Sequence, residues 1–200
     1  MKFVHILFIF LLMSCSSPDS NNLLSGESRI EDSNSRTISL QPFEGFSKDR
    51  VRFVESGIRS HFKKVHIRSK IELPTEAFYP PRNRYRADKI IDHLKSFAGK
   101  DTIVVGLTHR DISTTKNNFK DWGVMGLGFC PGNACVVSTF RLNNTNTDEQ
   151  LVKLVLHEIG HTFGLHHCPE KKCLMRDAEG GNPLNEEEGF CEECERKLAL

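Results

Sequence analysis

The sequence has no excess of charge of either sign. Its 27 lysines and arginines are balanced by 26 aspartates and glutamates, and the formal net charge of the 200 residues is +1 at pH 7. Domains that bind nucleic acid usually carry a clear basic excess, so no nucleic-acid partner is expected. The sequence also lacks an internal repeat and any apolar run long enough to span a bilayer. These absences argue against a repeat protein and against membrane-spanning helices.

The most extended apolar run stands at the N-terminus, from Phe3 to Met13 after Lys2, and has the length of a secretory signal core. It leads into Leu12-Met13-Ser14-Cys15, which resembles a bacterial lipoprotein cleavage box. We therefore predict a lipoprotein signal peptide over residues 1–14 and a lipid anchor on Cys15. An ordinary cleaved signal with an incidental cysteine is the alternative. The predicted location is the bacterial cell envelope, on a membrane; in a diderm cell this is the outer membrane or the periplasmic side.

Composition divides the rest of the chain into two parts. Residues 16–36 are rich in serine, asparagine and acidic residues and contain few apolar ones, a composition typical of flexible segments. We predict a tether over residues 15–36 and one domain over residues 37–200, which is long enough to bury a sizeable core.

Apolar spacing within this domain indicates an α+β fold. Period-2 alternation and short apolar runs predict strands, whereas the i, i+3, i+4 spacing of apolar residues predicts helices. The expected helices cover residues 48–62 and 86–97, and the expected strands cover residues 37–40, 65–73, 102–107, 124–129 and 135–140, the last two paired around a turn at 131–134.

A histidine-rich string lies in the C-terminal part of the domain. Residues 157–167 read HEIGHTFGLHH, which fits the pattern HExxHxxGxxH. His157 and His161 are four residues apart and share one helical face, so they can hold a zinc ion that keeps one position open. A chance match to HExxH in a chain of this length is roughly one in a thousand. The added glycine and histidine lower it by about another thousandfold.

The residues before this string predict the helix that carries it. Thr147-Asp148-Glu149-Gln150 forms a capping box with two acids in the first turn. The apolar residues that follow cover more than one face, which indicates a buried helix. Gly164 permits the left-handed turn that ends the helix and lets the chain fold back to the metal.

Two histidines follow that turn, and either could supply the third ligand. The HxxGxxH spacing selects His167 and leaves His166 near the site. Glu158 is rotated by ~100° from His157 around the helix, so it should approach a zinc-bound water rather than the metal. The expected function is zinc-dependent hydrolysis of a peptide or protein substrate, with Glu158 as the catalytic base.

Four cysteines form a second candidate metal site. Cys168 and Cys173 are separated by four residues, and Cys191 and Cys194 by two, close to the spacing of a four-cysteine structural zinc site. Two disulfides are the alternative in an exported protein. Because Cys168 directly follows His167, the second site would brace the third ligand of the first.

Another pair, Cys130 and Cys135, flanks the predicted turn at residues 131–134. In an exported protein the two could form a disulfide across the turn, since the chain approaches itself closely there. A free pair or an additional metal clip is the alternative.

The run HEIGHTFGLHHCPEKKCLM with CEEC downstream resembles the archaemetzincins, a family within the metzincin metalloproteases, whose pattern is HExxHxxGxxHCx4CxM followed by a distant CxxC. Every fixed position matches. The gap between Met175 and Cys191 holds 15 residues, slightly fewer than is usual in the family. The similarity extends in motif order over roughly residues 37–196, with weaker echoes at Arg84-Tyr85, Val136-Val137-Ser138 and Arg141-Leu142, but only residues 157–194 are specific.

The resemblance implies a zincin fold in which a mixed, twisted sheet lies beside an active-site helix, with a small zinc-braced C-terminal subdomain. It implies two Zn²⁺ ions per chain, one catalytic and one structural, and a turn at Met175 beneath the catalytic metal. By the same analogy, an edge strand over residues 136–140 is expected to pair with an extended substrate. The competing function is that of a non-catalytic zinc-binding lipoprotein. The residues implied are His157, His161 and His167 for the catalytic zinc, Cys168, Cys173, Cys191 and Cys194 for the structural zinc, and Glu158 as base.

Overall fold

Residues 35–199 are the part of the chain that the computed structural model describes. The predicted signal peptide, Cys15 and nearly all of the predicted tether lie outside them. Within the described residues, no helix is long and apolar enough to cross a membrane. Arg36, at the end of the predicted tether, already packs on the domain, with its guanidinium carbon 5.2 Å from the centre of the Phe163 ring. The α-helices are α1 (Lys48–Ile58), α2 (Ala87–Lys95), α3 (Thr147–Thr162) and α4 (Glu192–Leu198).

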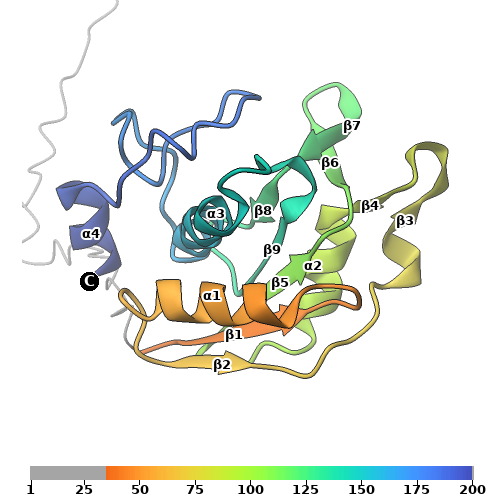
Figure 1. Ribbon diagram of the computed structural model, residues 1–200, viewed down its shortest axis with the longest axis horizontal. Coiled ribbons are helices and arrows are strands. Elements are labelled where there is room, and N and C mark those ends of the chain that lie inside the picture. Colours follow the sequence, from red (N-terminus) through yellow and green to blue (C-terminus); the bar gives the residue numbers. More distant parts are fainter. Residues whose placement is uncertain (1–34, 200) are drawn as a thin grey trace, which may run out of the picture.

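The larger sheet has five strands in the order β2-β1-β5-β9-β8 (Figure 1). The first four are parallel, and β8 pairs antiparallel with β9 at the edge. The expected hairpin around residues 131–134 is therefore present, but its second strand is interior, between β5 and β8, so the expected edge strand at residues 136–140 is wrong. The bounds are β1 (Thr37–Pro42), β2 (Val65–Ile67), β5 (Thr102–Thr108), β8 (Gly126–Gly128) and β9 (Ala134–Ser138).

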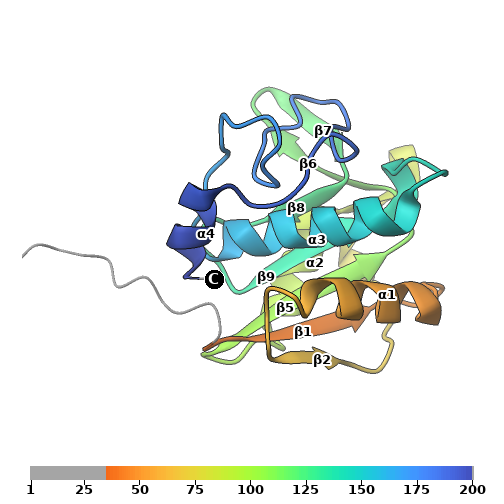
Figure 2. The ribbon, with the colours of Figure 1, turned by 60° about the vertical axis from the view of Figure 1, so that its left-hand side comes forward.

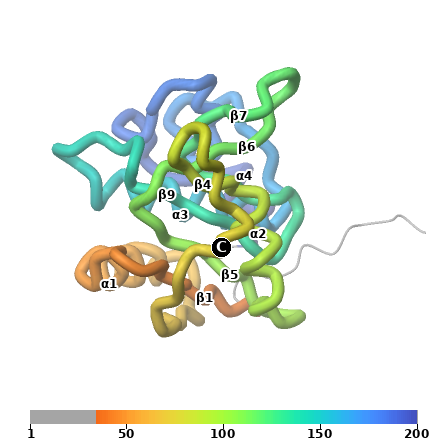
Figure 3. The backbone as a smooth tube through the Cα atoms, turned by 90° about the vertical axis from the view of Figure 1, so that its right-hand side faces the viewer, coloured from red at the N-terminus to blue at the C-terminus, as the bar shows by residue number. Residues whose placement is uncertain are grey.

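Helices cover both faces of this sheet. Alternate residues of β5 therefore pack into two different hydrophobic cores. Ile103 and Val105 belong to the core shared with α1 and α3, whereas Val104 packs into a second core with Ile90 and Ile91 of α2. A strand buried on both faces reads as a continuous apolar run. Figure 2 shows α3 lying along the sheet with α4 beside its C-terminal end, and Figure 3 shows α2 on the near side and α3 farther back.

A second, smaller sheet with the order β3-β4-β6-β7 stands beside the first. A buried ion network anchors it, since Asp111 lies 2.9 Å from Arg84 and 2.8 Å from Arg141. Its β6–β7 hairpin rises beside the site described below (Figure 1). None of these strands was expected. Their bounds are β3 (Phe78–Tyr79), β4 (Arg84–Arg86), β6 (Ile112–Lys116) and β7 (Phe119–Val124), and short 3₁₀ turns η1 (Thr75–Ala77), η2 (Pro80–Arg82) and η3 (Thr139–Arg141) connect the elements.

The long helix α3 begins and ends close to where the sequence predicts. Its start differs from a capping box, because the N-cap is Asn146 and the Thr147 hydroxyl donates to the carbonyl of Asn143 at 2.8 Å. Gln150 still reaches back, and its side-chain oxygen accepts from the Asn143 N–H at 2.9 Å. Its end is as predicted, since Gly164 has φ +93° and turns the chain back toward the helix.

Candidate metal centre and active site

The turn at Gly164 brings three histidines together. His157 and His161 project from the last turns of α3, and His167 follows the turn. One ring nitrogen from each residue lies within 4.8 Å of the other two, and the Nε2 atoms of His157 and His161 are 3.0 Å apart. Nitrogens about 2.05 Å from a tetrahedral zinc would be about 3.4 Å apart. The cluster therefore fits a zinc ion, and it contains His167 rather than His166.

Each histidine is held by a partner at its Nδ1 atom. His157 Nδ1 contacts the Leu174 carbonyl at 2.6 Å, and His161 Nδ1 contacts the Leu165 carbonyl at 2.7 Å. Since a carbonyl accepts, both Nδ1 atoms carry the proton, and both Nε2 atoms are left free to bind a metal. His167 Nδ1 lies 3.2 Å from a carboxylate oxygen of Asp177.

Burial favours the neutral form of two of these imidazoles. Burial, together with the charge of the neighbouring His161, lowers the pKa of His157 to about 3. Burial also lowers the pKa of His161. A protonated histidine cannot bind zinc, so rings that stay neutral at physiological pH suit the role of ligands.

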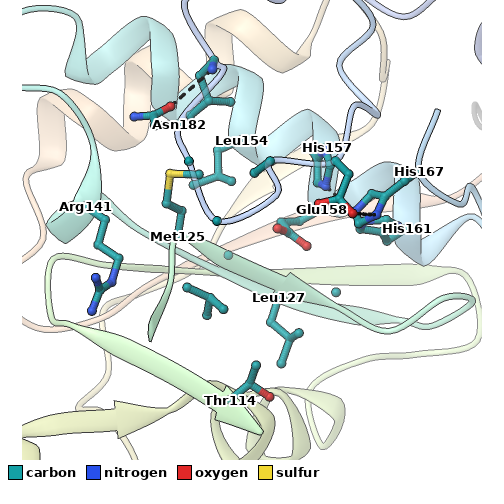
Figure 4. A pocket seen from close by; sticks show the side chains of 18 of the residues that line it. Thr114, Met125, Leu127, Arg141, Leu154, His157, Glu158, His161, His167 and Asn182 are labelled. Atoms are coloured by element: carbon teal, nitrogen blue, oxygen red, sulfur yellow. Dashed lines mark hydrogen bonds and ion pairs between the residues drawn. The ribbon is translucent and has the colours of Figure 1, made fainter. Parts of the chain in front are cut away.

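Glu158 lies beside the histidines and points into the same cleft (Figure 4). Only 5 % of the residue is exposed, and burial raises the pKa of its carboxyl to about 8; a cation beside it would lower this pKa. The strand β8 presses against it. A Cβ atom at Gly126 would lie 2.4 Å from Glu158 Oε1, and one at Gly128 would lie 2.8 Å from the Glu158 carbonyl oxygen. Glycine at both positions lets the strand approach the carboxylate this closely.

The four C-terminal cysteines also converge. Their sulfur atoms lie within 4.8 Å of one another, with 3.8 Å between Cys168 and Cys191 and 3.7 Å between Cys173 and Cys194. Sulfurs about 2.3 Å from a tetrahedral zinc would be about 3.8 Å apart, whereas a disulfide would bring them to about 2.05 Å. All four thiols are free, so the cluster fits zinc and not two disulfides.

Met175 and Leu174 join the two clusters. The Met175 sulfur lies under α3, where a Cβ atom at Gly160 would be 2.5 Å away from it. Leu174 supplies the carbonyl that holds His157, and its neighbour Cys173 belongs to the four-cysteine cluster. One short segment therefore orients a histidine of the first cluster and carries a thiol of the second.

Cys130 and Cys135 do not form the expected disulfide, because both thiols are free. Cys135 is fully buried in the core under α3, where burial raises the pKa of its thiol. Cys130 is exposed and its sulfur points elsewhere, 3.3 Å from the Leu165 carbonyl and 3.8 Å from Nδ1 of His166. The two side chains thus leave the hairpin in different directions, although the turn itself is as predicted.

The cleft at these histidines opens into a cavity of about 780 Å³. Its walls come from β6–β7, from β8, from α3 and from the segment after Met175. In Figure 4, Met125 and Leu154 lie on the side of Glu158 away from His161, and Arg141 lies beyond them.

Several residues of the site are absent from the sequence prediction. Leu174 and Leu165 act through backbone carbonyls, which no residue type marks. Asp177 carries no spacing signal of its own. Gly126 and Gly128 do carry one, because glycines two apart inside a predicted strand indicate a close backbone approach on one face.

Comparison with known proteins agrees with this geometry. The model of peptidase family M54 matches residues 38–200. Archaemetzincin from Methanopyrus kandleri is 33% identical over 149 residues, which cover 72% of this chain and 83% of that protein. Archaemetzincin from Halobacterium salinarum is 32% identical over 162 residues, covering 74% and 90%.

Solved structures agree as well. The crystal structure of archaemetzincin from Archaeoglobus fulgidus superposes with a TM-score of 0.70 at 26% identity, covering 80% of this chain and 99% of that one. The structure from Methanopyrus kandleri gives a TM-score of 0.69 at 28% identity, covering 84% and 97%. The family match over almost all of the described residues, the shared fold and the histidine cluster lead to one conclusion: the chain belongs to peptidase family M54, the archaemetzincins, and is a zinc metallopeptidase.

Proposed function

We propose that the chain hydrolyses peptide bonds in the cleft between β8 and α3, with zinc held by His157, His161 and His167 and with Glu158 as the base. The observation that supports this most is the convergence of three imidazoles beside a buried carboxylate. Zinc in this position supplies Lewis acidity, which polarises a substrate carbonyl and acidifies water.

The role of Glu158 follows from its position. Its carboxylate takes a proton from the attacking water and returns that proton to the leaving amine. Both transfers need the carboxylate to stay within hydrogen-bond distance of the reacting atoms. The contact with the backbone of Gly126 and Gly128 limits the directions in which Glu158 can move, so the strand that lines the cleft also positions the base.

The outer edge of β8 is suited to bind the substrate backbone. The Ser138 N–H donates to the Met125 carbonyl at 2.8 Å, and Gly126 lies opposite Val137 in the antiparallel register. In an antiparallel pair, every second residue of a strand forms its backbone hydrogen bonds with the neighbouring strand, and the residues between them direct their backbone groups to the other side. Gly126 and Gly128 therefore direct their N–H and C=O groups to the open edge, where an extended peptide can pair with them.

We also propose two zinc ions per chain, one at the histidines and one at the four cysteines. The supporting observation is that the donor atoms of both sets converge, with separations close to those in tetrahedral zinc sites. Metal analysis of the purified domain should find about two zinc ions per chain. A single ion together with oxidised cysteines would contradict the second site.

The lipid anchor on Cys15 remains a proposal, supported by the apolar run and the cleavage-box pattern. The change Cys15→Ser should abolish lipidation and release the protein from the membrane fraction, since the acyl chains supply the membrane affinity. Mass spectrometry of the N-terminal peptide and fractionation of cells measure both effects. An unchanged mass shift and unchanged membrane retention in the variant would exclude this anchor.

Cleavage of a mixed peptide library by the zinc-loaded protein tests the proposed function. Products identified by mass spectrometry would give the bonds that are cut. If no peptide were cleaved while two zinc ions were bound, the function of a non-catalytic zinc-binding lipoprotein would be favoured instead.

A further inference from the structure

A buried carboxylate lines the cavity beside Glu158 and has no role in the proposed chemistry. Glu187 is only 2 % exposed and forms part of the cavity wall. Its Oε2 atom is buried and has no hydrogen-bond partner among residues 35–199. The cavity walls also include the apolar side chains of Met125, Leu154 and Leu184.

The two cations whose charge acts on this carboxylate are engaged elsewhere. The Lys153 ammonium group donates to the backbone carbonyls of Leu184 and Glu187 at 2.7 and 2.6 Å. Arg176 pairs with a carboxylate oxygen of Glu186 at 2.6 Å. Neither cation therefore binds the Glu187 side chain directly.

The neighbouring amides are engaged as well. Gln150 donates to the Asn185 side chain at 2.7 Å and accepts from the Asn182 side chain at 3.1 Å. A buried carboxylate without a direct partner is unfavourable in its charged form, and burial raises the pKa of Glu187 to about 7. The fold thus holds an acidic group in the wall of a cavity and gives its side chain no direct ion-pair partner among the described residues.

The position of the cavity indicates which part of a substrate would enter it. It extends from Glu158 past Gly126 toward Met125 and Val124, before the start of β8. Antiparallel pairing is the more frequent and slightly more stable arrangement of strands. A peptide antiparallel to β8 would place the residues that follow the cleaved bond on this side.

We propose that this cavity is a specificity pocket for a cationic side chain, lysine or arginine, at the residue following the cleaved bond, with Glu187 as its counterion. The apolar walls would hold the methylene groups of such a side chain, and its charged end would meet the carboxylate. Arg141, which also lines the cavity, is already held by Asp111 at 2.8 Å. The inference rests on the proposed function, because it assumes that the substrate backbone binds along β8.

The test compares peptides that differ only at the residue following the cleaved bond, with lysine, norleucine or glutamate in that position. The zinc-loaded protein should cleave the lysine peptide with a kcat/KM about 10- to 100-fold above that of the norleucine peptide, the range expected for a hydrogen bond between charged groups. Glu187→Gln should remove this preference and change cleavage of the norleucine peptide by less than about threefold.

Glu188→Gln is the matched control, since Glu188 is the next residue but is exposed and paired with Lys172 at 2.7 Å. It should keep the preference for lysine. The Tm of Glu187→Gln should not fall, because the change removes a buried charge that has no direct partner. A lower Tm together with a retained preference for lysine would assign Glu187 a purely structural role.

A binding measurement separates this inference from the proposed function. Calorimetry with zinc-loaded Glu158→Ala protein should show tighter binding of the lysine peptide than of the norleucine peptide, and adding Glu187→Gln should abolish the difference. If no peptide were cleaved but this difference persisted, the proposed function would fail and the pocket assignment would stand. Equal binding of both peptides, or cleavage without a preference for lysine, would overturn the pocket assignment.

Discussion

Replacement of Glu158 by alanine is expected to reduce kcat/KM for peptide cleavage by about 10²- to 10⁴-fold, the usual contribution of a general acid–base group. The zinc content should not change, because Glu158 lies outside the histidine cluster. Alanine is smaller than glutamate and cannot clash with Gly126 or Gly128, so the fold around β8 should persist. Zinc content and cleavage rate are measured on the same samples.

His161→Ala provides the contrast. It removes one of the three converging nitrogens, so zinc and activity should be lost together. A Glu158→Ala protein that cleaved peptides at a near-normal rate would show the proposed mechanism to be wrong. If that variant lost zinc as well as activity, its defect could not be assigned to proton transfer.

Of the proposed substitutions, Cys173→Ser should lower the stability of the domain most. The Cys173 sulfur belongs to the four-cysteine cluster and also accepts from the N–H groups of Met175 and Cys191 at 3.4 Å. Loss of a structural metal ranks among the few changes that cost about 4 kcal/mol or more. For a domain of this size the Tm should then fall by about 8–16 °C.

Activity should fall in the same variant although no residue of the catalytic cluster is changed. Leu174, the next residue, supplies the carbonyl that orients His157 at 2.6 Å, so a displaced segment would turn that imidazole away. Cys130→Ser is the control, because Cys130 is an exposed free thiol outside the cluster. Thermal unfolding and zinc content measure the effect, and a variant with unchanged Tm and two bound zinc ions would contradict it.

The two clusters of candidate metal ligands could be predicted because each set is compact in sequence and chemically distinctive. His157, His161 and His167 are placed by one helix and one glycine turn. The groups that hold them could not be predicted, since Leu165 and Leu174 contribute carbonyls that every residue possesses. Glu187 was also missed, because it stands in a run of three glutamates that looks like a solvated surface, and only packing against α3 makes it a wall of the cavity.

The fold was predictable where apolar patterns were strong and was missed where pairing was long-range or polar. β5, with its apolar run, lies close to its expected bounds. β6 and β7 are mostly polar and pair with each other through a turn at Asn117, which has φ +53°. The interior position of β9 depends on its parallel pairing with β5, and local sequence does not specify such a pairing.

The three-residue length of β8 would limit where a peptide bound along this strand, as proposed, can be cut. Only Gly126 and Gly128 face the open edge with their backbone groups. A peptide on this edge can slide only in steps of two residues, about 6.8 Å, because a shift by one residue turns every side chain to the opposite face. A step of two residues would leave only one of the two glycines paired. If the substrate pairs with β8 as proposed, the short edge would favour one alignment of the peptide and therefore cleavage of one bond beside Glu158.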